Sequence, residues 1–190
     1  SYSSGVKVKN MLMFNSTIVA LFDNSTALVS TDGVNWAGDN GIGSGFGDAN
    51  NFIKDIEVFN SELYAVCNNP NTGVQIWKTS DLLTWSPVMQ DGFTNATNLY
   101  MAVDLHVAYN RLWVNTIVSG FSPINAAPVG HNQPSVLGGN QGPLVYSSGD
   151  GINFVRESYP LMGNLNNYQD WNLYSFSNKT LLYGWNFSIH

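Results

Sequence analysis

The stretch Ser30-Thr31-Asp32-Gly33-Val34-Asn35-Trp36 decides the fold, because the chain repeats it twice. Residues 148–154 keep its Ser, Asp, Gly, Asn and aromatic positions, and residues 79–85 keep a hydroxyl, the Asp and the Trp. An Asp that binds its own nearby backbone amides turns the chain, a Gly supplies a positive φ, and the closing aromatic residue starts the next strand. Each copy therefore predicts a β-hairpin turn. The residues predicted to hold these turns are Ser30, Asp32, Gly33, Trp36, Thr79, Asp81, Trp85, Ser148, Asp150, Gly151 and Phe154.

A second repeated element supports the first. Residues 11–20, 56–65 and 105–114 share an apolar run, an aromatic residue, an Asn or Ser at a bend and a second apolar run, and residues 173–182 are a degenerate fourth copy. The aromatic positions Phe14, Phe59, Tyr109 and Phe176 are 45, 50 and 67 residues apart, and the turn aspartates are 49 and 69 apart. Both intervals lengthen at the same place. This element predicts a second hairpin in each unit.

Two hairpins per unit give four antiparallel strands in roughly 45 to 50 residues, which is the size of one propeller blade. The sequence therefore predicts an all-β, propeller-like single domain, residues 1–190, of about four blades. The predicted blades are residues 6–38, 52–89, 100–159 and 170–190. The enlarged third interval contains the Gly- and Pro-containing segment 120–143, and residues 38–51 connect the first two blades.

The fourth predicted blade has only two strands, which leaves an open edge that sheet proteins normally pair or cover. The N-terminal residues 1–5 are similar to residues 146–149, which lead into the third turn. Three alternatives stay open for this terminus: it is disordered, it supplies the missing strand to its own last blade, or it pairs with a neighbouring copy.

The repeated turns resemble Asp boxes, the Ser-x-Asp-x-Gly-x-x-Trp repeats of sialidase-type and related β-propellers. The resemblance covers three of the four units. The aromatic residue follows the Asp one position early, and the second copy lacks the Gly. The resemblance implies structural turns on the outside of the blades, so it does not make Asp32, Asp81 or Asp150 catalytic. Sialidase activity is not carried over, since those enzymes use three arginines and this chain has only Arg111 and Arg156.

Composition narrows the classes of partner and compartment. Charged residues make up 11% of the chain, the net charge is −6 and the isoelectric point is near 4.7, so the sequence predicts no nucleic-acid partner. No apolar run is long enough for a membrane helix, so no membrane span is expected. The chain has no initiator Met and no signal peptide, which suggests a processed product. The single cysteine, Cys67, is expected to be a half-buried strand thiol.

Dense N-glycosylation sequons with few lysines predict a secreted or cell-surface glycoprotein. The five candidate glycosylation sites are Asn15, Asn24, Asn95, Asn178 and Asn186.

Candidate ligand-binding residues come from the repeat positions and from the incomplete unit. Asp55 and Asp104 stand at similar places before the inner hairpin, Asp170 is a further equivalent, and Asn10 replaces it in the first blade. These strand starts would form a ring of carboxylates and amides if they faced the central channel; repeat-driven structural equivalence is the simpler alternative. Trp171 and Trp185, in the incomplete unit, are the tryptophans expected to face a partner.

No cofactor or metal is predicted. The three histidines have no metal-ligand spacing. Calcium at residues 39–48 stays an alternative, because Asp, Asn and carbonyl oxygens suit that ion.

These observations favour an extracellular structural or adhesive propeller module that assembles with copies of itself into a surface layer or filament. The expectation leans away from an enzyme, because no catalytic set is assembled in the sequence. The alternatives are a carbohydrate-binding or glycoside-hydrolase-like propeller, with glycans as partners, and a fragment of a longer propeller.

Overall fold

A computed structural model of the 190-residue chain describes residues 5–38, 41–90, 92–93, 101–118, 142–157, 167–176 and 179–186. Of the last two ranges, only the backbone is described. Within all these ranges the chain forms fourteen β-strands and one 3₁₀ turn, η1 (Gly45–Gly47). The predicted all-β fold is confirmed.

The strands form four antiparallel sheets, each built from consecutive strands. The first sheet consists of β1 (Val8–Phe14), β2 (Thr17–Phe22), β3 (Ala27–Ser30) and β4 (Ala37–Gly38). The second consists of β5 (Phe52–Phe59), β6 (Glu62–Asn69), β7 (Gly73–Thr79) and β8 (Ser86–Met89). The third consists of β9 (Met101–Ala108), β10 (Arg111–Val118), β11 (Gly142–Ser148) and β12 (Val155–Arg156). The fourth, within the described residues, has two strands, β13 (Asn167–Phe176) and β14 (Lys179–Asn186).

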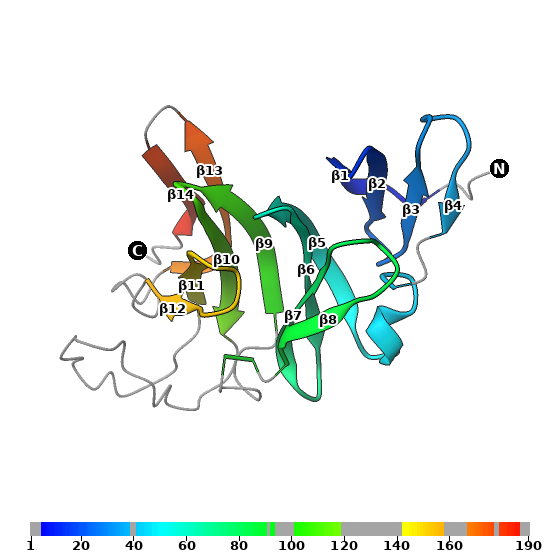
Figure 1. The fold of residues 1–190 in the computed structure, drawn as a ribbon. Coiled ribbons are helices and arrows are strands. Elements are labelled where there is room, and N and C mark those ends of the chain that lie inside the picture. Colours follow the sequence, from blue (N-terminus) through cyan, green and yellow to red (C-terminus); the bar gives the residue numbers. More distant parts are fainter. Residues whose placement is uncertain are drawn as a thin grey trace.

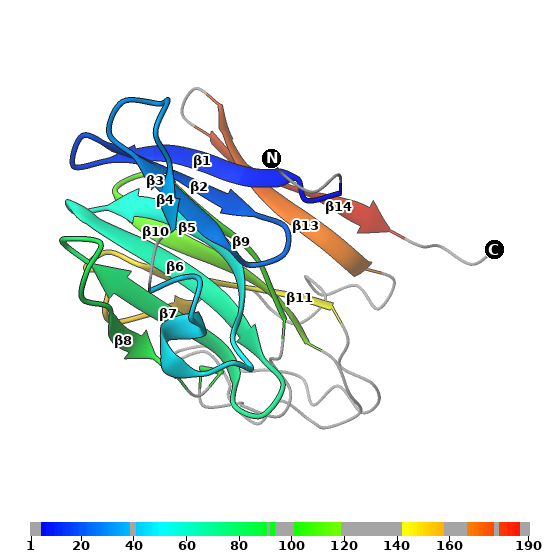
Figure 2. The ribbon, with the colours of Figure 1, turned by 90° about the vertical axis from the view of Figure 1, so that its right-hand side faces the viewer.

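The sheets stand side by side like the blades of a propeller (Figures 1 and 2). Their first strands meet in sequence: β1 contacts β5, β5 contacts β9, and β9 contacts β13. These four are therefore the inner strands, and β4, β8 and β12 lie at the opposite edges of their sheets. This arrangement is the β-propeller architecture that the repeats predict.

We call the face of a sheet that packs on the next sheet along the chain its back face and the opposite face its front face; in the second and third sheets the front face packs on the preceding sheet. The alternation of side chains along a strand sorts residues between the two faces. The back of the first sheet and the front of the second form one core, which includes Phe14, Val19, Leu21, Ile53, Ile56, Ala65 and Cys67. The back of the second sheet and the front of the third form another, which includes Phe59, Tyr64, Val66, Ile76, Leu105, Leu112, Val114 and Leu144.

Cys67 is free and fully buried in the first of these cores, not half-buried as the alternating sequence suggests. The second sheet is covered on both faces, so alternation does not leave one side in solvent. Burial raises the pKa of the Cys67 thiol to about 12.

The inner hairpins turn through pairs of residues with positive φ: Asn15-Ser16, Asn60-Ser61 and Tyr109-Asn110. The residues that precede these pairs are Phe14, Phe59 and Ala108, each paired with the first residue after the turn. The equivalence of Tyr109 with Phe14 and Phe59, expected from the sequence, is therefore wrong by one position. Two-residue turns set the register of a hairpin, so Ala108 takes the buried place and Tyr109, 53% exposed, takes the turn.

Candidate functional site

The three Ser/Thr-x-Asp turns close with the same hydrogen bonds. In the first turn, Asp32 Oδ1 accepts from the backbone N–H groups of Val34 (2.9 Å) and Asn35 (2.8 Å). In the other two turns the aspartate accepts from the corresponding pairs of amides, two and three residues ahead. The preceding hydroxyl of Ser30 accepts from Gly33 N–H at 2.8 Å. These bonds to backbone amides hold the pKa of all three aspartates below the usual range.

The turns differ where glycine is missing from the second copy. Gly33 and Gly151 both have φ near +75°, and Leu82 occupies the same place at φ +64°. A leucine in the left-handed region is strained, but Leu82 also packs against the core between the first two sheets. All the hydrogen bonds described above that these aspartates accept come from their own turn. The aspartates therefore stabilise the backbone of the outer turns and lie away from the inner strands.

A second repeated position brings three sheets together. Asp55, on inner strand β5 and only 6% exposed, accepts with Oδ1 from Asn10 Nδ2 of β1 (2.8 Å) and from Ile56 N–H (2.9 Å). Its Oδ2 accepts from Leu105 N–H of β9 (3.0 Å). Asn10 also donates to the Ile56 carbonyl (2.8 Å). One carboxylate thus joins the inner strands of the first, second and third sheets.

A β-bulge precedes this position in each of the three sheets. The pairing skips one residue between Val8 and Asn10, between Ile53 and Asp55, and between Ala102 and Asp104. A bulge bends its strand and re-aims the following side chain. The extra residue is Lys9 in β1 and Lys54 in β5. A lysine therefore directly precedes both Asn10 and Asp55.

We call the polar side chains at this meeting of inner strands the inner-strand cluster. Its members are Lys9, Asn10, Lys54, Asp55, Glu57, Asp104 and His106.

The cluster perturbs its own titrating groups. Loss of water around Lys9, and then the charge of Lys54, lower the pKa of the Lys9 amine, although Asp55 and Asp104 oppose this. Burial raises the pKa of Glu57, with a smaller contribution from Asp55, against the bond that Glu57 Oε1 accepts from Val58 N–H. Burial also lowers the pKa of His106. Both shifts favour the uncharged forms of Glu57 and His106 relative to the same side chains in water.

The cluster contains groups that donate hydrogen bonds and groups that accept them. Carboxylates and a neutral imidazole accept hydrogen bonds, and lysine amines donate them. Asp55 is already committed to three donors, so it positions its neighbours. Glu57, with a raised pKa, is the group best suited to give a proton. Asp104 has interactions of its own in the structure.

The other candidates are placed as follows. Trp171 and Trp185 lie on β13 and β14, and Asp170 on β13, where side chains are not described. Asn15 and Asn24 are exposed in tight turns, Asn186 ends β14, and Asn95 and Asn178 lie outside the described residues, as do the N-terminal residues 1–4. Sequence reasoning did not identify the lysines of the cluster. The bulges that place them could have been inferred only from an alignment of the repeats with the correct register.

Calcium at residues 39–48 stays a prediction, and residues 41–48 of this segment are described. Asp48 accepts from Asn50 N–H (2.9 Å) and from Asn69 Nδ2 (2.8 Å), which are bonds within the protein. Across the described residues, no three His, Cys, Asp or Glu side chains come together as a metal site. No helix in the described part of the chain is long and apolar enough to cross a membrane.

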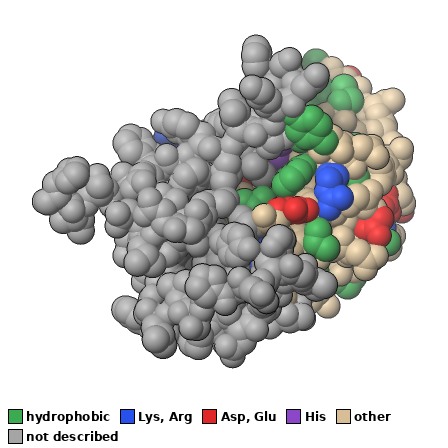
Figure 3. Space-filling model, turned by 90° about the vertical axis from the view of Figure 1, so that its left-hand side faces the viewer, with side chains coloured by type: hydrophobic (Ala, Val, Ile, Leu, Met, Phe, Trp, Pro, Cys, Tyr) green, Lys and Arg blue, Asp and Glu red, His purple; other side chains and the backbone are tan. Residues whose placement is uncertain are grey.

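The surface drawn in Figure 3 is mostly uncharged where it is described, and the Lys, Arg, Asp and Glu side chains on it form small separate groups. Two ion pairs are described, Lys78 with Glu62 (2.8 Å) and Arg111 with Glu157 (3.3 Å). This face therefore carries no broad basic patch in its described part.

Comparison with known proteins supports the fold. No protein-family model matches the chain, and no curated protein matches its sequence. Among solved structures, a glycoside hydrolase family 32 β-fructofuranosidase from Bombyx mori, bound to sucrose, is similar with a TM-score of 0.51 at 11% identity, over 90% of this chain and 39% of that one. The family 62 α-L-arabinofuranosidase domain from Coprinopsis cinerea gives a TM-score of 0.49 at 14% identity, over 93% of this chain and 65% of that one. A family 74 enzyme from Niastella koreensis gives 0.46 at 18%, over 80% and 22%.

The chain thus spans about two-fifths of the length of the Bombyx mori enzyme. At this identity the likeness shows the propeller fold alone.

Proposed function

We propose that the chain is a carbohydrate-binding propeller module and that the inner-strand cluster binds a neutral sugar. The observation that carries the proposal is the meeting of Lys9, Glu57, Asp104 and His106 around the Asp55 bridge on the inner strands. A sugar presents adjacent hydroxyls that both donate and accept. A mixed set of amines, carboxyls and an imidazole matches that pattern better than it matches a strongly charged ligand.

The known structures add a weaker argument by analogy. The propellers to which this chain is similar are named as glycoside hydrolases, and the one from Bombyx mori holds sucrose. Glycoside hydrolysis requires two carboxyl groups free to act on either side of the bond. Asp55 already accepts from three protein donors, which favours binding over hydrolysis for this chain and makes Glu57 the candidate acid if cleavage occurs.

The test is a glycan array followed by titration calorimetry with the sugars that bind. Glu57→Gln and His106→Ala should each weaken binding about tenfold, the loss expected when one good hydrogen bond to a ligand is removed. Asp32→Asn, in an outer turn, is the control and should bind normally. Absence of binding to any neutral glycan, or equal binding by all three variants, would reject the proposal.

We also propose that the protein is exported and glycosylated at exposed turns. Asn24 is suited to this, because its Oδ1 accepts from the Thr26 hydroxyl (2.7 Å) and its turn is exposed. Secretory expression with mass spectrometry of Asn24→Gln and of the parent protein tests it. The structural or adhesive role expected from the sequence finds no support in the comparisons.

A further inference from the structure

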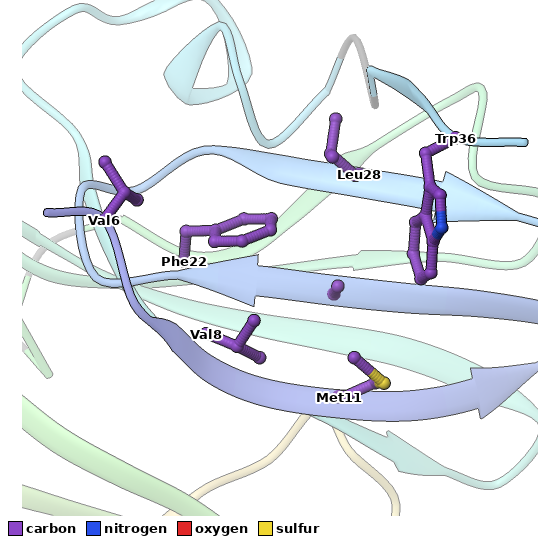
Figure 4. Close-up of a pocket in the computed structure, with 7 residues that line it drawn as sticks. Val6, Val8, Met11, Phe22, Leu28 and Trp36 are labelled. Carbon is purple, nitrogen blue, oxygen red and sulfur yellow. The ribbon is translucent and has the colours of Figure 1, made fainter. Parts of the chain in front are cut away.

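The hollow that the structure describes on the first sheet does not suit a sugar. It has a volume of about 310 Å³ and lies among apolar side chains, including Val6, Phe22 and Leu28 (Figure 4). The one side-chain N–H group among its lining residues is that of Trp36, which already donates to the carbonyl oxygen of Gly33 (3.2 Å). These side chains therefore offer a sugar hydroxyl no free hydrogen-bond donor.

A buried polar side chain on the third sheet offers both a donor and an acceptor. Asn115, on β10, is 0% exposed, and neither its amide nitrogen nor its amide oxygen has a hydrogen-bond partner in the described part of the chain. Leaving both groups of an amide unpaired in a buried place lowers the stability of a folded protein. Proteins accept such local losses of stability mainly at functional sites.

The corresponding places in the first two sheets are apolar. The residue that follows the β-bulge of each inner strand is paired with one residue of the second strand: Leu21 in the first sheet, Val66 in the second and Asn115 in the third. Leu21 and Val66 are both 0% exposed and belong to the cores between sheets. Packing between sheets is therefore satisfied by an apolar residue at this place, and the amide of the third sheet is a departure that packing does not require.

The amide lies on the same face as two members of the inner-strand cluster. Val114 belongs to the core with the second sheet, so its neighbour Asn115 lies on the back face of the third sheet. Its cross-strand partner on that face is Asp104, and the Cβ atoms of directly paired residues lie about 5 Å apart. His106 is paired with Trp113 on the same face. The amide is therefore next to the cluster, one strand further from the propeller axis.

We propose that Asn115 is a specificity-determining residue of the sugar site and that its amide binds a hydroxyl group of the sugar. The inference rests on the proposed carbohydrate-binding function. A hydroxyl both donates and accepts, as a side-chain amide does, so it can pair with the two groups that are unpaired in the structure. Asp104 and His106 are only half-buried, whereas Asn115 is covered, so this hydroxyl is the most deeply bound group of the sugar. A site of this kind rejects analogues that lack the hydroxyl, because its buried polar groups then stay unpaired.

Titration calorimetry of the full chain with a panel of neutral sugars (glucose, galactose, fructose, arabinose and sucrose) tests the proposal. Asn115→Val and Asn115→Ala remove the amide, and each should raise the dissociation constant of the sugar that binds the parent about tenfold, the loss expected for one hydrogen bond. Asn115→Val should not lower the melting temperature, because Val66 fills the corresponding place in the second sheet. Weaker binding without a loss of stability is a result that a merely structural role of Asn115 would not give.

Monodeoxy analogues of the same sugar identify the hydroxyl. One analogue should bind the parent about tenfold more weakly than the complete sugar does. The same analogue and the complete sugar should bind Asn115→Val equally, because the variant has no amide to pair with the missing hydroxyl.

The matched control is Asn69→Ala, which removes a buried amide that has partners within the protein. Asn69 is also 0% exposed, but its Nδ2 donates to Asn51 Oδ1 (2.7 Å) and its Oδ1 accepts from Asn71 N–H (2.9 Å). Asn69→Ala should lower the melting temperature and leave the affinity for the sugar unchanged. Circular dichroism checks that each variant folds.

Two outcomes overturn the role of Asn115 while the carbohydrate site stands. One is an unchanged affinity for the sugar in both Asn115 variants. The other is a set of monodeoxy analogues that lose as much affinity for Asn115→Val as for the parent. Either result would assign the amide to a bound water or to the contact between β10 and β13. If the parent binds no sugar of the panel, the proposed function and the role of Asn115 are both rejected.

Discussion

The outer turns and the inner-strand cluster both repeat an acidic or amide side chain, but they use it differently. Asp32, Asp81 and Asp150 bind backbone two and three residues ahead, inside a single hairpin. Asp55 binds Asn10 and Leu105, which are 45 and 50 residues away in the chain. The outer aspartates therefore stabilise each sheet separately, whereas Asp55 stabilises the joint between three sheets. A substitution in an outer turn should therefore destabilise one sheet, whereas a substitution of Asp55 should destabilise the contact between three sheets.

The largest effect is expected from Asp55→Ala. Removal of the carboxylate leaves the N–H groups of Ile56 and Leu105 without an acceptor in a buried place, and each such loss costs about 1 to 3 kcal/mol. The free energy of unfolding should fall by about 3 kcal/mol or more. Urea denaturation measures it.

The control for Asp55 is its amide. Asp55→Asn keeps the shape and one acceptor oxygen, so it should lose less stability than Asp55→Ala. If Asp55→Ala lowers the free energy of unfolding no more than Asp32→Ala does, the contact between the inner strands contributes no more stability than one outer turn. That result would contradict the difference drawn between the two regions.

The next largest effect separates two glycines with the same backbone. Gly33 and Gly151 both have φ +75°, but a Cβ on Gly151 would collide with the Tyr64 hydroxyl, whereas one on Gly33 would meet only Ile18 Cδ1 at 3.7 Å. Gly33→Ala should cost about 1 kcal/mol for left-handed strain alone. Gly151→Ala should cost about 3 kcal/mol, since it also disturbs a fully buried Tyr64. If Gly33→Ala and Gly151→Ala lower the melting temperature equally, Tyr64 moves aside without a loss of stability.

The pH dependence of stability should have opposite signs in the two regions. The lowered pKa values of Asp32 and Asp150 mean that their contribution is present above about pH 4, the ordinary aspartate value, and is lost as the pH falls toward the folded-state pKa. Asp32→Asn combined with Asp150→Asn should therefore flatten the fall in melting temperature on acidification. An unchanged acid slope in the double variant would contradict this assignment.

Glu57 in the inner-strand cluster should behave in the reverse way. Its raised pKa means that its contribution is present below the ordinary glutamate pKa and is lost as the pH rises through the folded-state value. Glu57→Gln should thus gain stability relative to the parent at neutral pH, and the gain should vanish near pH 4. Melting temperatures measured across this range check both the sign and the window.

The sequence could predict the outer turns with their bonds, but at the inner joint it could predict only the equivalent places of Asn10, Asp55 and Asp104 and not the bonds that Asp55 accepts, and the reason is physical. An outer turn is decided by four or five consecutive residues, so Ser30, Asp32 and Gly33 are enough to specify it. The place of Asp55 depends on a bulge at Lys54 and on the register of three separate strands. A one-residue error in the third hairpin, where Tyr109 was aligned with Phe59, does not affect the predicted fold. A one-residue slip along β9 would move its side chains to the other face, but the predicted pairing of Asp104 with Asp55 keeps the correct register, because each stands four residues before the last residue of its strand.

The smallest effect concerns the outer turn that departs from its siblings. Leu82 has a strained backbone at φ +64°, but its side chain packs on a core. Replacement by glycine removes both the backbone strain and the packing, whereas replacement by alanine removes only the packing. Leu82→Gly should therefore be more stable than Leu82→Ala by about 1 kcal/mol. At Leu83, which is 86% exposed and has no positive φ, the order should reverse, because glycine there only adds freedom to the unfolded chain. Alanine more stable than glycine at both positions would mean that the second turn relaxes to a backbone unlike that of the other two.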